Sequence, residues 1–162
     1  MKDLTLYNHI NSSLQCISCY DADINVIDSY DEKQTPFLTL WVGNETRHGT
    51  ADEGLVRRAY DCKSAFSIIY VGKLKRRQNG ADEKTIELDE IKDKIEFCIN
   101  KVSREKQFTI YDTLATTEKQ MEIYLEDIVV NDIYKTYPVL DNQNISILFE
   151  GEIYYKQINY IN

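Results

Sequence analysis

The chain has 162 residues, of which 43% are hydrophobic and 28% charged, and its formal net charge at pH 7 is -8. This length suits one domain, residues 1–162, whose core needs no disulfide or metal, and the composition is too apolar for a disordered chain. The negative charge argues against a partner held through nucleic-acid phosphates, because such binding needs many Lys and Arg side chains.

The first segment of the chain has the residue spacing of a helix. Apolar residues recur three and four positions apart from Leu4 to Ile17, and this period is typical of one face of a helix. We therefore expect a helix over residues 3–18. Neither this segment nor any other approaches about 18 consecutive apolar residues, so we expect no membrane span and no signal peptide.

A strand entered through a proline comes next. Residues 24–27 form a short β-branched run, and Pro36 then leads into the strand 37–42, which Gly43 is expected to end. The near-continuous apolarity of this second strand predicts that both of its faces are covered. The polar residues 44–57 are predicted as a long loop or an extended hairpin tip.

Alternating Ile, Tyr, Phe and Val residues predict a long strand over residues 60–71, which Gly72 should end. Residues 73–80 are predicted as a basic turn. The clearest helix of the chain follows and should pack on a sheet, because one stripe gathers its apolar side chains. These are Leu88, Ile91, Ile95, Cys98, Ile99 and Val102.

Three strands are predicted in the remaining chain, at residues 108–111, 121–134 and 145–155. In the second of them, strict alternation places four residues on one face: Ile123, Leu125, Asp127 and Val129. In the third, the shared face carries Ile145, Ile147, Phe149, Gly151 and Ile153. The order of helix, strands, helix, strands indicates an α+β fold without the regular alternation of a parallel α/β protein.

An acidic segment nearly copies a calcium-binding loop. Asp21, Asp23, Asn25 and Glu32 have the ligand spacing of an EF-hand. The pattern lacks the glycine of the sixth position, where Val26 stands, and it leads into a strand instead of a second helix. We expect a solvated acidic loop.

The four cysteines are too sparse for a secreted disulfide scaffold and fit a reducing cytosol. Cys16 and Cys19 have the spacing of half a zinc site or a redox pair, but the second half is missing. Cys62 and Cys98 stand alone in a strand and a helix. We expect no metal site.

Catalytic chemistry finds little support in the sequence. Only His9 and His48 could act as histidine acid–base groups, and no motif supplies a nucleophile beside them. Carboxylate pairs such as Glu126 and Asp127 are neighbours in a strand and face opposite ways. The glycines form no phosphate-binding pattern. We predict no catalytic residue, no cofactor and no enzymatic activity.

Basic residues are the candidate contacts. The run within residues 73–77 is either a charged hairpin turn that discourages edge pairing or a contact for an acidic surface on a neighbouring subunit or partner. Both interpretations stay open. The candidates for inter-subunit or partner contacts are Arg47, His48, Arg57, Arg58, Lys73, Lys75, Arg76 and Arg77.

Laid out in order, the chain resembles the tail terminator family of long-tailed bacteriophages. The likeness lies in the layout and covers roughly residues 1–157. Its parts are an N-terminal helix, a strand entered through a proline and an aromatic with the polar segment after it (35–46), a long strand (59–71), an amphipathic helix (87–102) and two closing strands (122–133 and 144–156). The segments 44–57 and 113–120 are longer than the corresponding segments of the family pattern.

The resemblance implies a mainly antiparallel sheet with two α-helices packed on one face. It also implies a homohexameric ring that caps the tail tube, ends its polymerisation and offers a docking surface to the head–neck connector. The partners would be other copies, the tail tube protein and connector proteins, in a virion tail or neck assembled in the host bacterial cytoplasm. DNA would pass through the lumen without specific binding, which an acidic channel favours.

Two other functions compete with this one. The chain could be another neck, connector or tail protein of a phage, or an acidic inhibitor that mimics DNA in a basic cleft. A third alternative, an enzyme using clustered carboxylates and a metal, requires metal in the purified protein.

Overall fold

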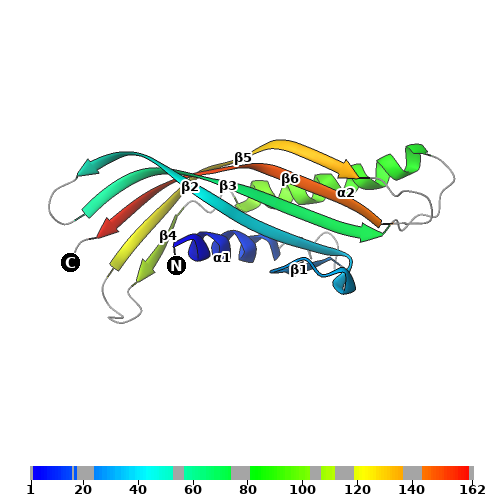
Figure 1. The fold of residues 1–162 in the computed structure, drawn as a ribbon, viewed down its shortest axis with the longest axis horizontal. Coiled ribbons are helices and arrows are strands. Elements are labelled where there is room, and N and C mark those ends of the chain that lie inside the picture. The colour runs from blue at the N-terminus through cyan, green and yellow to red at the C-terminus, as the bar shows by residue number, and fades with distance from the viewer. Residues whose placement is uncertain are drawn as a thin grey trace.

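One sheet organises the described part of the chain. The computed structural model describes residues 2–15, 17, 24–52, 57–73, 81–102, 107–111, 119–136 and 144–160. The elements are α1 (Lys2–Leu14), β1 (Asn25–Ile27), the 3-10 turn η2 (Glu32–Gln34), β2 (Phe37–Asp52), β3 (Arg57–Lys73), α2 (Ala81–Val102), β4 (Gln107–Tyr111), β5 (Lys119–Thr136) and β6 (Asn144–Tyr160). The strands form a six-stranded sheet in the order β1-β2-β3-β6-β5-β4 (Figure 1).

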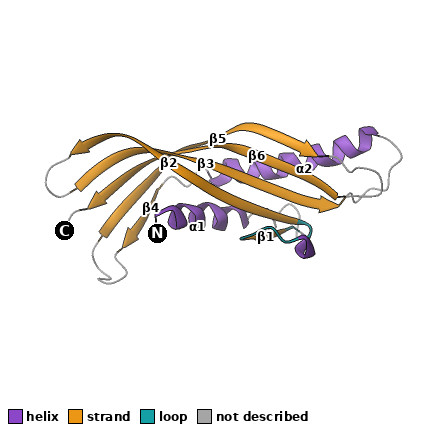
Figure 2. Ribbon diagram, in the orientation of Figure 1, coloured by secondary structure: helices purple, strands orange, loops and turns teal. Residues whose placement is uncertain are grey.

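Four long strands make up the centre of this sheet. β2, β3, β6 and β5 run antiparallel to one another in that spatial order. The short β1 lies parallel to β2 at one edge, and the short β4 lies antiparallel to β5 at the other edge (Figure 2). The prediction of an α+β fold with a mainly antiparallel sheet is therefore confirmed.

Both helices pack on the same face of the sheet, because their apolar stripes share one buried cluster with the inward side chains of the strands. In α1, Leu6, Ile10 and Leu14 lie four residues apart and are all buried. The helix ends before the predicted residue 18, and Gln15 and Ile17 continue it as 3-10 turn. In α2, the predicted stripe is buried from Leu88 to Ile99.

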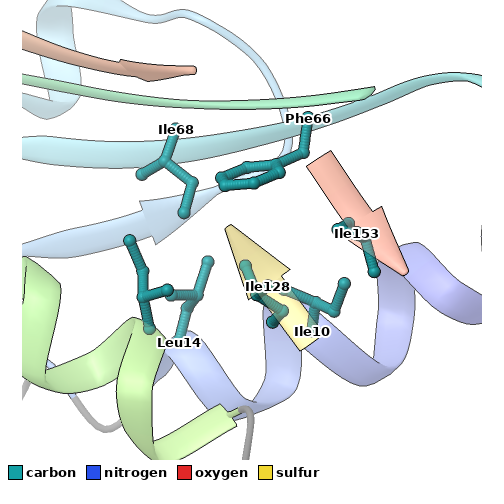
Figure 3. A pocket seen from close by; sticks show the side chains of 7 residues that line it. Ile10, Leu14, Phe66, Ile68, Ile128 and Ile153 are labelled. Atoms are coloured by element: carbon teal, nitrogen blue, oxygen red, sulfur yellow. The ribbon is translucent and has the colours of Figure 1, made fainter. Parts of the chain in front are cut away.

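Packing between the helices and the sheet is tight. Figure 3 shows Phe66 and Ile68 of β3 facing Ile10 and Leu14 of α1 across a small apolar cavity of about 10 Å³. The whole lining is apolar: Ile10, Leu14, Phe66, Ile68, Ile99, Ile128 and Ile153. A space this small without polar partners gives a water molecule nothing to bind.

The strand after Pro36 is longer than the sequence predicts. Gly43 does not end it, since β2 continues to Asp52. The polar residues Thr46 and His48 pair with residues of β3. Backbone hydrogen bonds to this long strand therefore extend β2 into a segment whose side chains show no hydrophobic alternation. The described residues 44–52 are therefore strand, which agrees with an extended hairpin and excludes a loop there. Residues 53–56 lie outside the described residues.

The prediction that both faces of this strand are covered is wrong in part. Phe37 and Leu38 are both fully buried, but Trp41 is 57% exposed. Trp41 points away from the helices, which cover only one face of the sheet. The short β1 covers the neighbouring edge no further than Thr39.

The predicted alternation in β5 fails after Leu125. The register to β6 shifts between Leu125 and Asp127, and again between Val130 and Asp132. A β-bulge adds one residue to a strand, so each shift moves the following side chains to the other face. Ile128, Val130 and Ile133 consequently pack against the core, while Asp127 is exposed.

Candidate functional site

The predicted contact residues separate into two groups along the sheet. Arg47 and His48 lie in the second half of β2, and Arg58 is the second residue of β3, so the hairpin places all three towards one end of the sheet. Lys73 ends β3 at the opposite end of the sheet. Arg57 is described only by its place in β3. The remaining three lie outside the described residues: Lys75, Arg76 and Arg77.

Arg47 is held by the hairpin from which it extends. Its Nε donates a hydrogen bond to Glu45 Oε2 at 3.1 Å, and its guanidinium carbon lies 4.5 Å from the ring centroid of Tyr60. The side chain still keeps 37% of its surface exposed. Exposed cation–π contacts and ion pairs of this kind each contribute about 1 kcal/mol or less, so Arg47 can still contact a partner.

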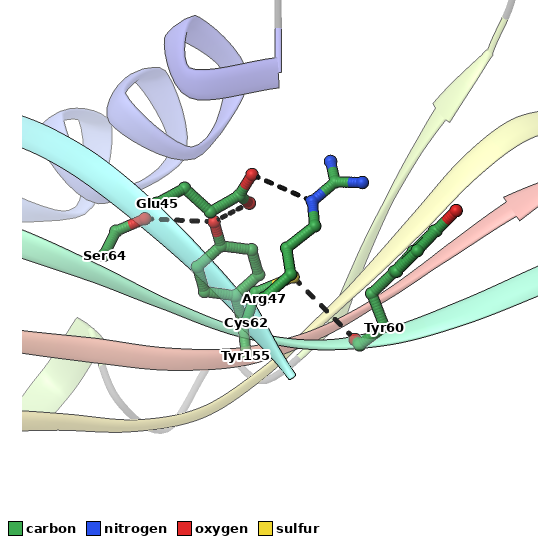
Figure 4. A network of polar contacts seen from close by, with 6 residues as sticks. All are labelled: Glu45, Arg47, Tyr60, Cys62, Ser64 and Tyr155. Carbon is green, nitrogen blue, oxygen red and sulfur yellow. Dashed lines mark hydrogen bonds and ion pairs between the residues drawn. The ribbon is translucent and has the colours of Figure 1, made fainter. Parts of the chain in front are cut away.

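A buried polar cluster beneath Arg47 joins β2, β3 and β6 (Figure 4). The hydroxyl of Tyr155 donates a hydrogen bond to Glu45 Oε1, and the Ser64 hydroxyl lies 3.0 Å from the Tyr155 hydroxyl. Tyr155 and Ser64 are each 1% exposed. Burial, and then the hydrogen bond to Glu45, raise the pKa of Tyr155 well above its ordinary value. The phenol is therefore a neutral donor that ties the three strands together.

Cys62 belongs to the same cluster and is also buried. Its thiol donates to the carbonyl oxygen of Tyr60 at 3.8 Å. Burial first, and the Glu45 carboxylate second, raise the pKa of Cys62 to about 12. Because the thiolate is the nucleophilic form of cysteine, this environment suppresses its reactivity. The cluster thus holds the three strands together through buried hydrogen bonds.

Sequence reasoning missed this cluster. Alternation does place Ser64 and Tyr155 on the inward faces of their strands, since they share parity with Phe66 and Ile153. The third member, Glu45, falls in the segment predicted as loop or hairpin tip. Because a β-bulge precedes Glu45, the sequence pattern does not predict that its side chain faces the core.

Alkaline pH should weaken the fold through this cluster. The folded-state pKa of Cys62 is about 12 against an ordinary value of 9.0, so its contribution is fully present below about pH 9 and is lost as the pH rises towards 12. Tyr155 acts in the same direction. We expect the urea midpoint to fall between about pH 8 and about pH 10.5, and to fall less in a Cys62→Ala/Tyr155→Phe variant. An equal fall in both proteins would contradict this assignment.

The face of the sheet opposite the helices carries an acidic hollow. Asp132 of β5 and Glu150 and Glu152 of β6 border a space of about 320 Å³, and Trp41 of β2 lines it. Tyr134 of β5 lies on the same face and is 50% exposed. Such a wide space bordered by carboxylates differs from the enclosed and mostly apolar pockets that bind small molecules.

The calcium-like pattern is only partly placed by the structure. Asp21 and Asp23 lie outside the described residues, whereas Asn25 begins β1 and its Nδ2 donates to the carbonyl oxygen of Gln34 at 3.0 Å. Within the described ranges, no three His, Cys, Asp or Glu side chains gather closely enough to hold a metal ion. No metal-binding arrangement can therefore be built from the described side chains.

The other chemically notable residues are scattered. Cys16 and Cys19 lie outside the described residues, and Cys98 is fully buried in α2. His48 is exposed on β2, while the side chain of His9 is not among those described. Neither of the helices in the described part of the chain is long and apolar enough to cross a bilayer.

Comparison with known proteins identifies no relative: no protein-family model matches the sequence, and no curated protein matches it at a significant level. The likeness to tail terminators thus rests on element order alone.

Proposed function

We propose that the chain is a structural subunit of a homohexameric ring that caps the tail tube of a long-tailed bacteriophage. The ring ends tube growth and offers the head–neck connector a docking surface. One observation supports this proposal most: the helices cover one face of the sheet, while the other face carries the acidic hollow. A ring with its helices outward turns this acidic face to the lumen.

The charge of that face suits a channel through which DNA slides. Asp132 is exposed, and Glu150 and Glu152 are half-buried beside it. Exposed carboxylates repel a phosphate that comes within about one Debye length, about 8 Å at physiological salt. The net charge of -8 on each copy adds to the repulsion. DNA can then pass without binding.

The direct test uses the purified chain with the tube protein of the same phage. Light scattering after size exclusion and negative-stain imaging should show six-membered rings, alone or at the ends of tubes. Adding the chain to polymerising tube protein should shorten the tubes. A chain that stays monomeric at high concentration and never binds tube ends would refute the proposal.

Reversing the lumen charge should convert the ring into a DNA-binding one. In Asp132→Lys/Glu150→Lys, two acidic side chains of the hollow become basic in every copy, so duplex DNA should bind with an affinity that falls steeply with salt. The matched control is Glu90→Lys/Asp93→Lys, which makes the same charge change on the exposed surface of α2. Equal DNA binding by both rings, measured by fluorescence anisotropy, would place the acidic face elsewhere than the lumen.

The same acidic face also supports a second candidate function, an inhibitor that occupies the basic cleft of a nucleic-acid-binding protein. Such a protein should remain monomeric and retain a basic partner in a pull-down at low salt. Loss of that partner at high salt, together with the absence of rings, would favour this candidate over the first.

A further inference from the structure

Two long stretches of strand edge border no described strand on their outer sides. β1 pairs with β2 only over Phe37–Thr39, and β4 pairs with β5 only as far as Tyr124. Among the described residues, this leaves 40–52 of β2 and 125–136 of β5 open at the two edges. Figure 1 shows β1 and β4 near opposite ends of the sheet, so the open stretches lie at opposite corners.

We propose that copies of the chain join edge to edge, with the open edge of β2 in one copy beside the open edge of β5 in the next. Both edges belong to an antiparallel run of four long strands, so β2 and β5 point in opposite directions. A head-to-tail repeat therefore continues the sheet in antiparallel order. Such a contact is heterologous and can close into a ring. The closure into a capping ring rests on the proposed function, whereas the edge contact does not.

The short edge strands limit the stagger between neighbouring copies. Phe37 and Thr136 lie in one row of the sheet, through Val71 and Ser146. The stagger must be an even number of residues, because an odd one would turn the helix-covered face of one copy to the other side. A stagger of two would place Thr39 beside Thr136, where β1 already lies.

A stagger of four satisfies both ends. It places Trp41, four positions after Phe37, beside Thr136 and thus just beyond the end of β1. At the other end it places Asp52 beside Leu125, immediately before Tyr124, where β4 begins. Both short strands therefore set the same lower limit, and four is the even stagger that avoids them while pairing the longest stretch of the two edges.

The two edges carry the same number of residues in this register, although their bulges do not stand opposite each other. The stretches 41–52 and 125–136 are equally long, and each contains two register shifts. Bulges commonly protect an edge from pairing, but here both partners carry the same number of extra residues. Counted past the bulges, Thr46 lies opposite Asp132, Arg47 opposite Val130 and His48 opposite Val129, and no two like charges oppose each other.

The register also accounts for the exposed aromatic residues of the open face. Trp41 and Tyr134 are 57% and 50% exposed in one copy, on strands at opposite edges of the central run. Between copies, Trp41 lies opposite Thr136 and hence diagonal to Tyr134. Diagonal neighbours of an antiparallel pair lie about 7–8 Å apart, which aromatic side chains span. The contact would cover both rings.

The stagger corresponds to a defined strand tilt if the sheet closes into a ring. Four residues over four long strands amount to one residue per strand. An eight-stranded barrel with a shear of eight has the same ratio, and its strands tilt by about 36°. In a closed ring built on this contact, the strands would tilt by a similar angle.

Disulfide cross-linking tests the register. Thr46→Cys and Asp132→Cys replace two exposed residues on opposite edges, in a chain whose Cys16 and Cys19 are Ser, so a new disulfide must join two copies. Oxidation should give a ladder of covalent oligomers at least about tenfold faster than in the control Thr46→Cys/Asp127→Cys. The control keeps an exposed thiol on the same face but places it opposite Ala51. Equal or faster cross-linking of the control would overturn the register.

Fluorescence gives a second test without a new thiol. Trp41 is the only tryptophan of the chain, so its emission reports on this contact alone. We expect the emission to shift to shorter wavelengths as the protein assembles with rising concentration, and Tyr134→Ser to move assembly to at least about tenfold higher concentration. Assembly without any change in the emission of Trp41 would overturn the contact.

Failure of this contact and failure of the proposed function are distinguishable. Rings that cap tubes but show no cross-linking between positions 46 and 132 would refute the contact and leave the function standing. A covalent ladder with no effect on tube growth would refute the function and leave the contact standing.

Discussion

Gly151→Ala should destabilise the fold by about 3 kcal/mol, a large cost for one added methyl group. Gly151 is buried in β6, where it pairs with Phe66 of β3 and Val130 of β5. A Cβ at this position would lie 2.9 Å from Cε1 of Phe66 and closer still to the carbonyl oxygen of Val129. The second contact is with backbone, which cannot rotate away, so the strands themselves would have to separate.

Gly43→Ala is the matched control. A Cβ at Gly43 would also meet a close neighbour, the indole ring of Trp41, whose Cζ3 atom would lie 2.6 Å away. That ring belongs to a side chain that is 57% exposed and can move into solvent. Urea unfolding followed by circular dichroism should therefore show a cost below about 1 kcal/mol for Gly43→Ala. Similar midpoints for the two variants would show that β5 and β6 tolerate the extra atom.

The sequence predicts β3 and β6 better than β2 and β5, for a physical reason. β3 pairs with β6 from Arg57 and Tyr160 to Lys73 and Asn144 without any register shift. An inner strand that is bonded on both sides keeps a strict period of two, so burial follows the alternation of its residues. Prediction therefore works for Ile145, Ile147, Phe149, Gly151 and Ile153, which are all buried.

The outer two of the four long strands, β2 and β5, break this rule, since each carries two register shifts. A bulge leaves no reliable mark in a single sequence, so the inward positions of Glu45 and Ile128 could not be predicted from period alone. Contact residues are equally hard to predict from the sequence. Arg47 and His48 are predicted from their charge, whereas the exposure of Trp41 depends on which face the helices cover and on where β1 ends.

Ile68→Ala and Ile69→Ala remove the same atoms from neighbouring positions of β3 and should have very different costs. Ile68 is 1% exposed and lines the apolar cavity beside Ile10 and Leu14 of α1 (Figure 3). Its truncation should cost about 2–5 kcal/mol, because the tight packing around it can collapse only in part. Ile69 is half-buried on the face opposite the helices, and its truncation should cost about 1 kcal/mol or less.

The two isoleucine variants should be compared in dilute solution. In dilute solution, where copies are separate, urea unfolding measures the packing of a single chain, and only the helix-covered face should then contribute a large term. Equal costs for Ile68→Ala and Ile69→Ala under these conditions would mean that the open face is covered within one chain. That face could then neither line a lumen nor present Trp41 to a neighbouring copy.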